Sequence, residues 1–184
     1  MLNFFAHPSS FVDEKAQIGD NTKIWHNAQI RNLAIIGKNC ILGKNVYVDK
    51  DVVIGNNVKV QNNASIYHGV KIEDGVFIGP HACLINDKFP RAITPSGDLK
   101  TDQDWETGKT LIKEGASIGA NATIFPNVTI GKYALIGACS AVVKDIPDYA
   151  LAYGNPARVM GFVCKCGFKI KKGETCNKCK FVLK

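Results

Sequence analysis

Branched apolar residues return at every sixth position of this chain over two long segments. The first segment runs from Val12 to Leu84, and the second runs from Ile112 to Val142. A row of mainly small or β-branched residues, beginning at Ala16, keeps the same period two positions before each apolar residue. A period of six fits neither the period of about 3.6 of a helix nor the period of 2 of a simple strand. It indicates instead a stacked β-helix, in which each hexad supplies one short strand and one turn.

Three hexads would form one triangular coil, so the two segments predict a prism of just over six coils. One coil cannot bury its own apolar residues, but coils stacked about 4.8 Å apart bury a continuous column. Glycine follows several of the apolar positions, as at Gly19 and Gly37. We expect glycine there because the backbone must bend tightly.

Residues 85–111 break the six-residue period. This stretch carries prolines, glycines and many charged residues, which cannot continue a strand stack, so we expect one long excursion. Loops of this length are usually either functional or disordered. Phe89, Leu99 and Trp105 favour an ordered loop that packs on another surface, such as a neighbouring subunit.

The two ends of the prism are expected to be capped. Residues 1–10 read as a lead-in to the first coil, and Pro147 stops the strand pairing at the other end. The segment Asn155–Arg158 then predicts a turn into a short helix that covers the last coil. The expected domains are therefore residues 1–161, an all-β prism, and residues 162–184, a small tail.

The tail contains two close cysteine pairs, which are Cys164 with Cys166 and Cys176 with Cys179. Such pairs are typical of a four-thiolate zinc site, although the first pair is CxC and the second CxxC. A disulfide pair is disfavoured without an export signal, and a redox dithiol needs no second pair. With 21 residues from Cys164 onward and hardly any apolar core, the tail would need a structural Zn²⁺ to fold. Of the other cysteines, Cys40 is expected in the core, and Cys83 and Cys139 have no expected role.

Charge adds little about the ligand of the prism. The net charge is +7, but the stretch from Lys165 to Lys184 holds seven lysines against the single Glu174, so the prism is nearly neutral. Nucleic acid is therefore not an expected partner. No apolar run reaches the roughly 18 residues of a membrane span, and the N-terminus does not read as a signal peptide. We expect a cytoplasmic protein without membrane contact.

The repeat resembles that of the left-handed β-helix acyltransferases, the hexapeptide-repeat family, over residues 8–161. Several motifs further resemble the subgroup that N-acetylates the 3-amino group of a UDP-linked amino-uronic acid, and acyltransferases of dTDP-linked 3-amino sugars share part of the pattern. These motifs are Ile24-Trp25-His26, residues 58–63, residues 76–80, Asn86-Asp87, Pro90-Arg91 and residues 154–158. The resemblance implies an acetyl-CoA-dependent N-acetyltransferase in surface polysaccharide biosynthesis, acting as a homotrimer with sites between subunits.

Two residues are the catalytic candidates. Asn86 matches an asparagine of the family at the start of the excursion, where it would position the amine or stabilise the tetrahedral intermediate; otherwise it satisfies loop backbone. His68 lies where relatives usually carry an acidic residue, and it could act as a general base or be a turn histidine facing solvent. Similar enzymes manage without a protein base, with the departing thiolate taking the proton.

Binding roles are assigned more loosely. Gln61, Asn62 and His26 fit contacts to the sugar or to an interface, and the planar fork of Arg91 suits a carboxylate or diphosphate. Lys144 and Arg158 could meet CoA phosphates, although a surface lysine and a cap-stabilising arginine explain them equally well.

Two other functions remain open on the sequence. A γ-class carbonic anhydrase uses the same prism with three histidine ligands, but His26 and His81 are three coils apart and His68 lies on another face. A non-catalytic trimeric scaffold with a zinc-ribbon contact module would not need Asn86 and Arg91 in a long interrupted loop.

Overall fold

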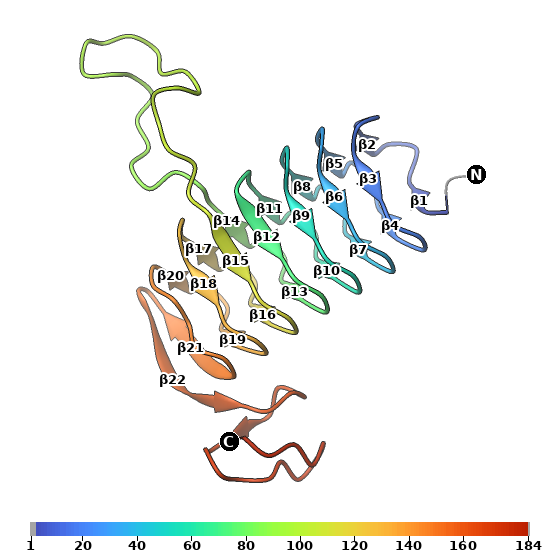
Figure 1. The fold of residues 1–184 in the computed structure, drawn as a ribbon, viewed down its shortest axis with the longest axis vertical. Coiled ribbons are helices and arrows are strands. Elements are labelled where there is room, and N and C mark those ends of the chain that lie inside the picture. Colours follow the sequence, from blue (N-terminus) through green and yellow to red (C-terminus); the bar gives the residue numbers. More distant parts are fainter. Residues whose placement is uncertain (1–2, 184) are drawn as a thin grey trace.

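The chain folds into a triangular prism of parallel β-strands, seen in a computed structural model that describes residues 3–183 (Figure 1). Successive strands go to successive faces, and each strand pairs in parallel with the strand one coil further on, as Ile24 pairs with Leu42. The described residues form only strands, turns and bends, and none of them forms a helix that could cross a membrane. The predicted all-β stack of hexads is confirmed.

Three faces, here called A, B and C, make up the prism. Face A contains β1 (Phe5–Ala6), β4 (Lys23–Ile24), β7 (Ile41–Leu42), β10 (Lys59–Val60), β13 (Phe77–Ile78), β16 (Ser117–Ile118), β19 (Leu135–Ile136) and β21 (Ala150–Gly154). Face B contains β2 (Phe11–Val12), β5 (Gln29–Ile30), β8 (Tyr47–Val48), β11 (Ser65–Ile66), β14 (Cys83–Leu84), β17 (Thr123–Ile124) and β20 (Ala141–Val142). Face C contains β3 (Gln17–Ile18), β6 (Ile35–Ile36), β9 (Val53–Ile54), β12 (Val70–Ile72), β15 (Thr110–Ile112) and β18 (Thr129–Ile130).

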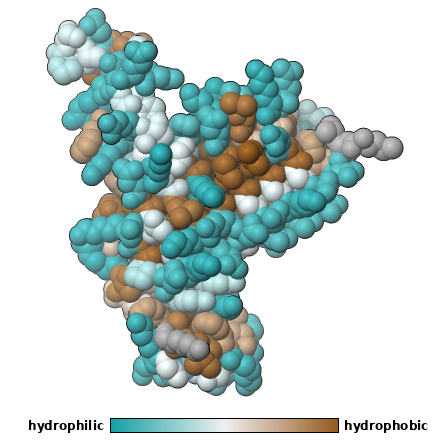
Figure 2. All heavy atoms as spheres, in the orientation of Figure 1, coloured by the Kyte–Doolittle hydropathy of each residue, from teal (hydrophilic) through white to brown (hydrophobic). Residues whose placement is uncertain are grey.

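The core is the column that the two residue rows predict. The apolar row is fully buried through the middle of the prism, as at Ile30, Ile66 and Ile124, and the small row fills the corners between faces, as at Ala28 and Ala64. The two strand residues alternate, one pointing inward and one outward, so each strand contributes one side chain to the column. Figure 2 shows that apolar surface visible from this side gathers on the prism, while the projecting excursion is mostly hydrophilic.

Turn chemistry differs from the expectation. The left-handed backbone conformation falls three positions after most of the apolar residues, where asparagine often sits, as at Asn39 (φ 57°) and Asn57 (φ 56°). Gly37 is needed for another reason: a Cβ there would lie 2.6 Å from the carbonyl carbon of Gly55 in the next coil. Asparagine therefore makes the bend, and glycine lets adjacent coils approach.

The structure covers the first coil as expected and corrects the C-terminal cap. The lead-in contains β1, which pairs with β4 and so adds a strand to face A. The expected C-terminal helix does not form: β21 pairs with the free edge of β19, and the Asn155–Arg158 segment turns the chain back as β22 (Ala157–Val163). The open edge of β19 pairs with β21. A helix in place of β21 would leave the backbone groups along that edge unpaired.

The tail continues face A. The short β23 (Lys169–Ile170) pairs antiparallel with β22, and β22 runs across the expected domain boundary at residue 161. Figure 1 places this tail at the opposite end of the prism from the N-terminal strands.

Candidate active site

Two of the prism edges carry the candidate residues. Edge AB consists of the turns from face A to face B, which include residues 25–28, 43–46 and 61–64. Edge BC consists of the turns from face B to face C, which include residues 49–52 and 67–69, and of the excursion between β14 and β15.

His68 and Asn86 come together on edge BC. Ile66 pairs with Leu84, so the residues two positions later, His68 and Asn86, begin the same turn in adjacent coils, about 4.8 Å apart along the stack. A backbone hydrogen bond from the Tyr67 amide to the Leu84 carbonyl oxygen (3.3 Å) joins the two coils, and the amide of Gly108 donates to the Asn86 carbonyl oxygen over 2.8 Å, which closes the base of the excursion. The two catalytic candidates are therefore neighbours at the root of the excursion.

The ring of His68 is held by the coil before it. Its Nδ1 lies 3.0 Å from the carbonyl oxygen of Lys50, and the side chain is 30% exposed. A carbonyl oxygen only accepts hydrogen bonds, so Nδ1 must carry a proton and, in a neutral ring, Nε2 keeps a lone pair. Asp51 Oδ2 lies 3.7 Å from the same Nδ1. This arrangement suits a proton acceptor.

Asp49 is a functional candidate that sequence reasoning missed. Its carboxylate accepts from the backbone amides of Lys50 (2.8 Å) and His68 (3.2 Å), from the Tyr47 hydroxyl (3.0 Å) and from Arg31 (3.3 Å). It thereby joins the Lys50 turn to the His68 turn, which keeps the Lys50 carbonyl against the ring. Burial alone would raise the pKa of Asp49, but these donors outweigh it and lower the pKa below 3.8.

Asp49→Asn is expected to remove a pH-dependent part of the stability. Because folding lowers the pKa of Asp49, its contribution is present above the unfolded pKa and is lost as pH falls through the folded value. We expect the variant to melt earlier than wild type near neutral pH, with the gap closing in acid. Thermal melts across pH measure this, with exposed Glu106→Gln as control; a gap that stays constant with pH would contradict the assignment.

Edge AB carries the other predicted contacts. The exposed His26 ring stacks on His7, with ring centroids 3.5 Å apart. The side-chain oxygen of Asn62 accepts from the Lys44 amide over 2.9 Å, so Asn62 joins two coils, while Gln61 is half-buried beside it. Face B separates these residues from His68 and Asn86, and one chain does not bring the two groups together.

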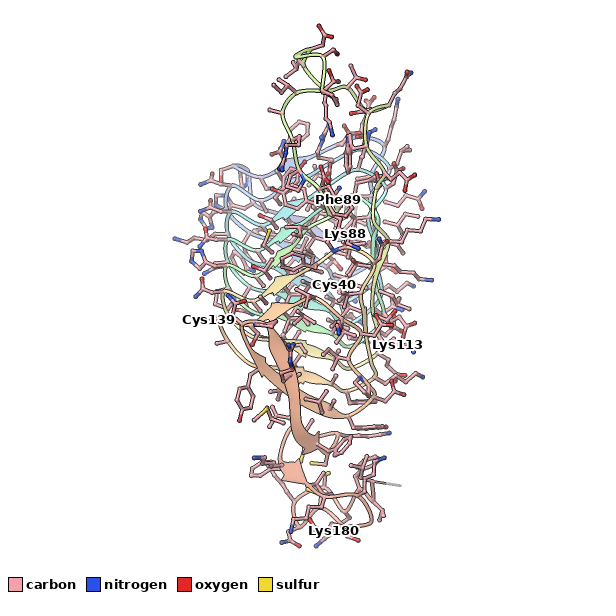
Figure 3. The ribbon with its side chains drawn as sticks, turned by 90° about the vertical axis from the view of Figure 1, so that its left-hand side faces the viewer. Cys40, Lys88, Phe89, Lys113, Cys139 and Lys180 are labelled. Atoms are coloured by element: carbon pink, nitrogen blue, oxygen red, sulfur yellow. The ribbon has the colours of Figure 1, made fainter. Side chains whose placement is uncertain are left out.

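The excursion projects from edge BC (Figure 1) and covers residues 85–109, slightly fewer than expected because β15 begins at Thr110. Lys50 Nζ lies 3.5 Å from Asp102 Oδ2, which ties the loop to the turn below it. Phe89 and Leu99 are 74% and 78% exposed, so these apolar side chains do not pack on their own prism. Figure 3 shows Lys88 and Phe89 together at the base of the loop.

A cavity of about 390 Å³ lies at the root of the excursion. Its walls come from the loop and from edge BC, and they include Lys88, Lys100, Trp105 and Asn127. The walls also carry the carboxylates of Asp87, Asp104 and Glu106, so the two lysines do not make the cavity positively charged.

The other predicted binding residues are dispersed. Lys144 is exposed on edge BC, and Ile124 pairing with Val142 puts it two coils beyond Asn86 on the same edge. The guanidinium groups of Arg91 and Arg158 donate to the backbone oxygens of Pro90 (2.8 Å) and Ala157 (3.0 Å). Neither arginine contacts His68 or Asn86 within residues 3–183.

Four cysteine sulfurs meet in the tail. Cys164, Cys166, Cys176 and Cys179 place their sulfur atoms within 4.8 Å of one another, a group that could hold a metal ion. Within the described part of the chain, no other group of three or more histidine, cysteine or acidic residues does so. Cys40 is buried in the core as expected, whereas Cys83 is half-buried and Cys139 is exposed.

These features define a parallel β-helix of hexapeptide repeats with candidate polar residues along two edges. Residues 15–50 and 51–86 match the family model "Bacterial transferase hexapeptide (six repeats)". Residues 15–86 therefore carry repeats like those of this family, and the fold of the chain is the left-handed β-helix that the repeat predicts.

Two curated relatives match part of the chain. It is 61% identical over 64 residues to dTDP-3-amino-3,6-dideoxy-α-D-galactopyranose 3-N-acetyltransferase of Aneurinibacillus thermoaerophilus, covering 35% of this chain and 33% of that protein. It is 37% identical over 86 residues to a serine acetyltransferase of Haemophilus influenzae, covering 46% and 31%. The chain thus spans about a third of the length of these relatives.

Solved structures share the fold. A GDP-perosamine N-acetyltransferase mutant from Caulobacter crescentus, in complex with CoA and GDP-perosamine, superposes with a TM-score of 0.58 at 23% identity, covering 87% of this chain and 57% of that chain. A mutant of AntD, an N-acyltransferase from Bacillus cereus in complex with dTDP and coenzyme A, gives a TM-score of 0.54 at 23% identity, covering 82% and 79%.

Proposed function

We propose that this protein transfers the acetyl group of acetyl-CoA to the 3-amino group of a nucleotide-linked amino sugar. The observation that carries the proposal is the pairing of His68 with Asn86 at the root of the excursion. The 61% identity to a 3-N-acetyltransferase of a dTDP-linked amino sugar supports the choice of a 3-amino group.

The nucleotide and the sugar have two candidates. The motifs around Trp25 and Asn86 resemble enzymes that act on a UDP-linked amino-uronic acid, whereas the relative acts on a dTDP-linked sugar without a carboxylate. Both substrates present a 3-amino group and a diphosphate. The excursion cavity is lined by both lysines and carboxylates and favours neither diphosphate, so the assay must distinguish the substrates.

The chemistry is attack of a neutral amine on a thioester. The new C–N bond forms as the C–S bond breaks, and the amine loses one proton. In the proposal, His68 Nε2 accepts that proton and passes it to the departing CoA thiolate. Asn86 lies in the coil adjacent to that of His68, and its side-chain amide would orient the amine or donate to the developing oxyanion.

The position of His68 is set by residues that do not touch substrate. Asp49 accepts from the backbone amide of His68, and the Lys50 carbonyl oxygen accepts from ring Nδ1, which leaves Nε2 as the nitrogen that can take a proton. Asp49 is thus a positioning residue in this proposal, and Lys144, further along edge BC, would meet the phosphates of CoA.

A homotrimer completes the site in this proposal. If edge BC of one copy meets edge AB of the next, His26 and Gln61 of one copy face His68 and Asn86 of the other. Face B would then point toward the threefold axis, and its outward side chains in the C-terminal half are short: Ser65, Cys83, Thr123 and Ala141. The exposed Phe89 and Leu99 would pack on the neighbouring copy.

The cysteine cluster has a structural role in this scheme. Four thiolates fill a tetrahedral shell around Zn²⁺ and leave no position for a substrate or a reacting water. The tail is therefore outside the reaction.

A thiol-release assay with acetyl-CoA tests the function. The panel contains UDP- and dTDP-linked 3-amino sugars, with and without a 5-carboxylate, and the 3-hydroxy counterpart of each. We expect release only with 3-amino sugars, and mass spectrometry should show one acetyl group added to the sugar. Asn86→Ala should be much slower, whereas Asn32→Ala, which begins the equivalent turn three coils earlier on edge BC, should match wild type. Absence of thiol release with every amine would overturn the proposal and favour a non-catalytic trimeric scaffold.

A further inference from the structure

We propose that the four tail cysteines bind one Zn²⁺ and that the loaded tail clamps the last coils of the prism through Tyr149. The site is distinct from the two edges, and the inference does not depend on the proposed function. The tail lies beyond the last coil, with Lys180 at its far end (Figure 3).

The sulfur positions fit a tetrahedral metal. Sγ of Cys164 lies 3.2 Å from that of Cys166 and 3.3 Å from that of Cys176, and Cys166 and Cys176 are 3.8 Å apart. A tetrahedron with Zn–S bonds of about 2.3 Å has S···S edges of about 3.8 Å. All these distances exceed the roughly 2.05 Å of a disulfide bond, so the thiols are free and face a common centre.

Two tight turns present the thiols. The amide of Cys164 donates to the Phe168 carbonyl oxygen (2.9 Å), and the amide of Cys176 donates to the Phe181 carbonyl oxygen (2.8 Å). Gly167 and Lys180 take the left-handed backbone conformation that closes each turn, with φ of 83° and 59°. The tail therefore contains two similar knuckles, each of which contributes two sulfur atoms.

The tail has little else to hold it together. Apart from cysteines, its buried side chains among the described residues are Val163, Ile170 and Leu183, and β23 has only two residues. So small a core does not stabilise a segment of this length without a crosslink or a metal. The surrounding lysines would favour the net charge of minus two that four thiolates and one Zn²⁺ create.

The metal site is coupled to the prism through an aromatic stack. Tyr149, on the turn before β21, stacks on Phe181 of the second knuckle at 5.0 Å and on Tyr133 at 5.5 Å. Lys165, between the cysteines of the first knuckle, places Nζ 5.1 Å from the Tyr133 ring and 5.5 Å from the Phe181 ring. The Val163 amide also donates to the Tyr149 carbonyl oxygen over 2.8 Å. A metal that fixes both knuckles would also fix Lys165 and Phe181, whose side chains contact Tyr133 and Tyr149 of the prism.

Metal analysis of the full-length protein tests the site. We expect one zinc per chain by elemental mass spectrometry, and Co²⁺ exchanged into the wild type should give thiolate-to-cobalt absorption. Cys176→Ser should lose most of the zinc, whereas Cys139→Ser, an exposed cysteine outside the cluster, should keep it. Iron in place of zinc, or disulfide bonds between these cysteines, would overturn the site.

Hydrogen exchange tests the clamp. Removing zinc from wild type should reduce protection of the amides in residues 150–163, because their anchor on the tail is lost. Tyr149→Leu should keep one zinc per chain, yet its protection in that segment should already be low and change little on zinc removal. Zinc removal that leaves wild-type protection unchanged would show that the metal stabilises the tail alone.

Discussion

His68→Gln is expected to lower kcat for acetyl transfer by about 100-fold or more, the usual effect of losing a general base. Glutamine keeps a side chain of similar reach that can still contact the Lys50 carbonyl oxygen, but it offers no basic nitrogen for the amine proton. KM for the sugar should change much less than kcat, because the proton moves in the transition state. Steady-state thiol release with the best substrate of the panel measures both constants.

The control for this prediction is Lys38→Gln, on the turn from face C to face A, which belongs to neither edge AB nor edge BC. Lys38 Nζ lies 3.2 Å from Asp20 Oδ2 at the surface, so its replacement should leave kcat near the wild-type value. If His68→Gln turned over as fast as wild type, the departing thiolate would be the proton acceptor and His68 a turn residue.

Ile78→Ala is expected to destabilise the prism by about 2–5 kcal/mol, the range for truncating a fully buried isoleucine. Ile78 has no exposed surface and lies in the apolar column between Val60 and Ile118 of the adjacent coils. Because each coil is stabilised only by its neighbours, the cavity weakens two coil interfaces in the middle of the stack.

Denaturant unfolding at a fixed protein concentration measures this loss, since assembly contributes to apparent stability. Lys59→Ala, the neighbouring strand residue that points outward, should shift the midpoint little. Equal shifts of the unfolding midpoint for the two variants would contradict a core formed by one column of inward-facing side chains.

The sequence predicts most of the fold because the apolar residues repeat every six positions, whatever residues lie between them. Each hexad buries its own residue at a fixed place, so the core, the faces and the excursion follow from counting. The structure of the C-terminal cap could not be predicted from the six-residue repeat. The last coil is shortened: Ile146 bridges Ile130, 16 residues away, whereas coils that the excursion does not interrupt repeat at 18. The cap forms the β21–β22 hairpin instead of a helix because β21 pairs with the free edge of β19.

The candidate site is predicted unevenly for a similar reason. His68 and Asn86 are 18 residues apart, so the period alone puts them together on edge BC. Asp49 was missed because its role depends on hydrogen bonds to the backbone of the next coil, which no side-chain pattern reports. Glycine was correctly located but wrongly explained, since the contact that requires Gly37 lies one coil away.

The central structural claim is that acetyl transfer takes place between two copies of the chain. Mixed oligomers test it most directly, made from a His68→Gln chain and a His26→Ala, Gln61→Ala chain that carry different tags. Each variant alone should be nearly inactive, because each impairs every site. A trimer that contains both chains should regain one intact site of its three, since one interface combines two unaltered edges. Mixed trimers that stay as inactive as the parents, or an edge AB variant that keeps full activity, would contradict the claim.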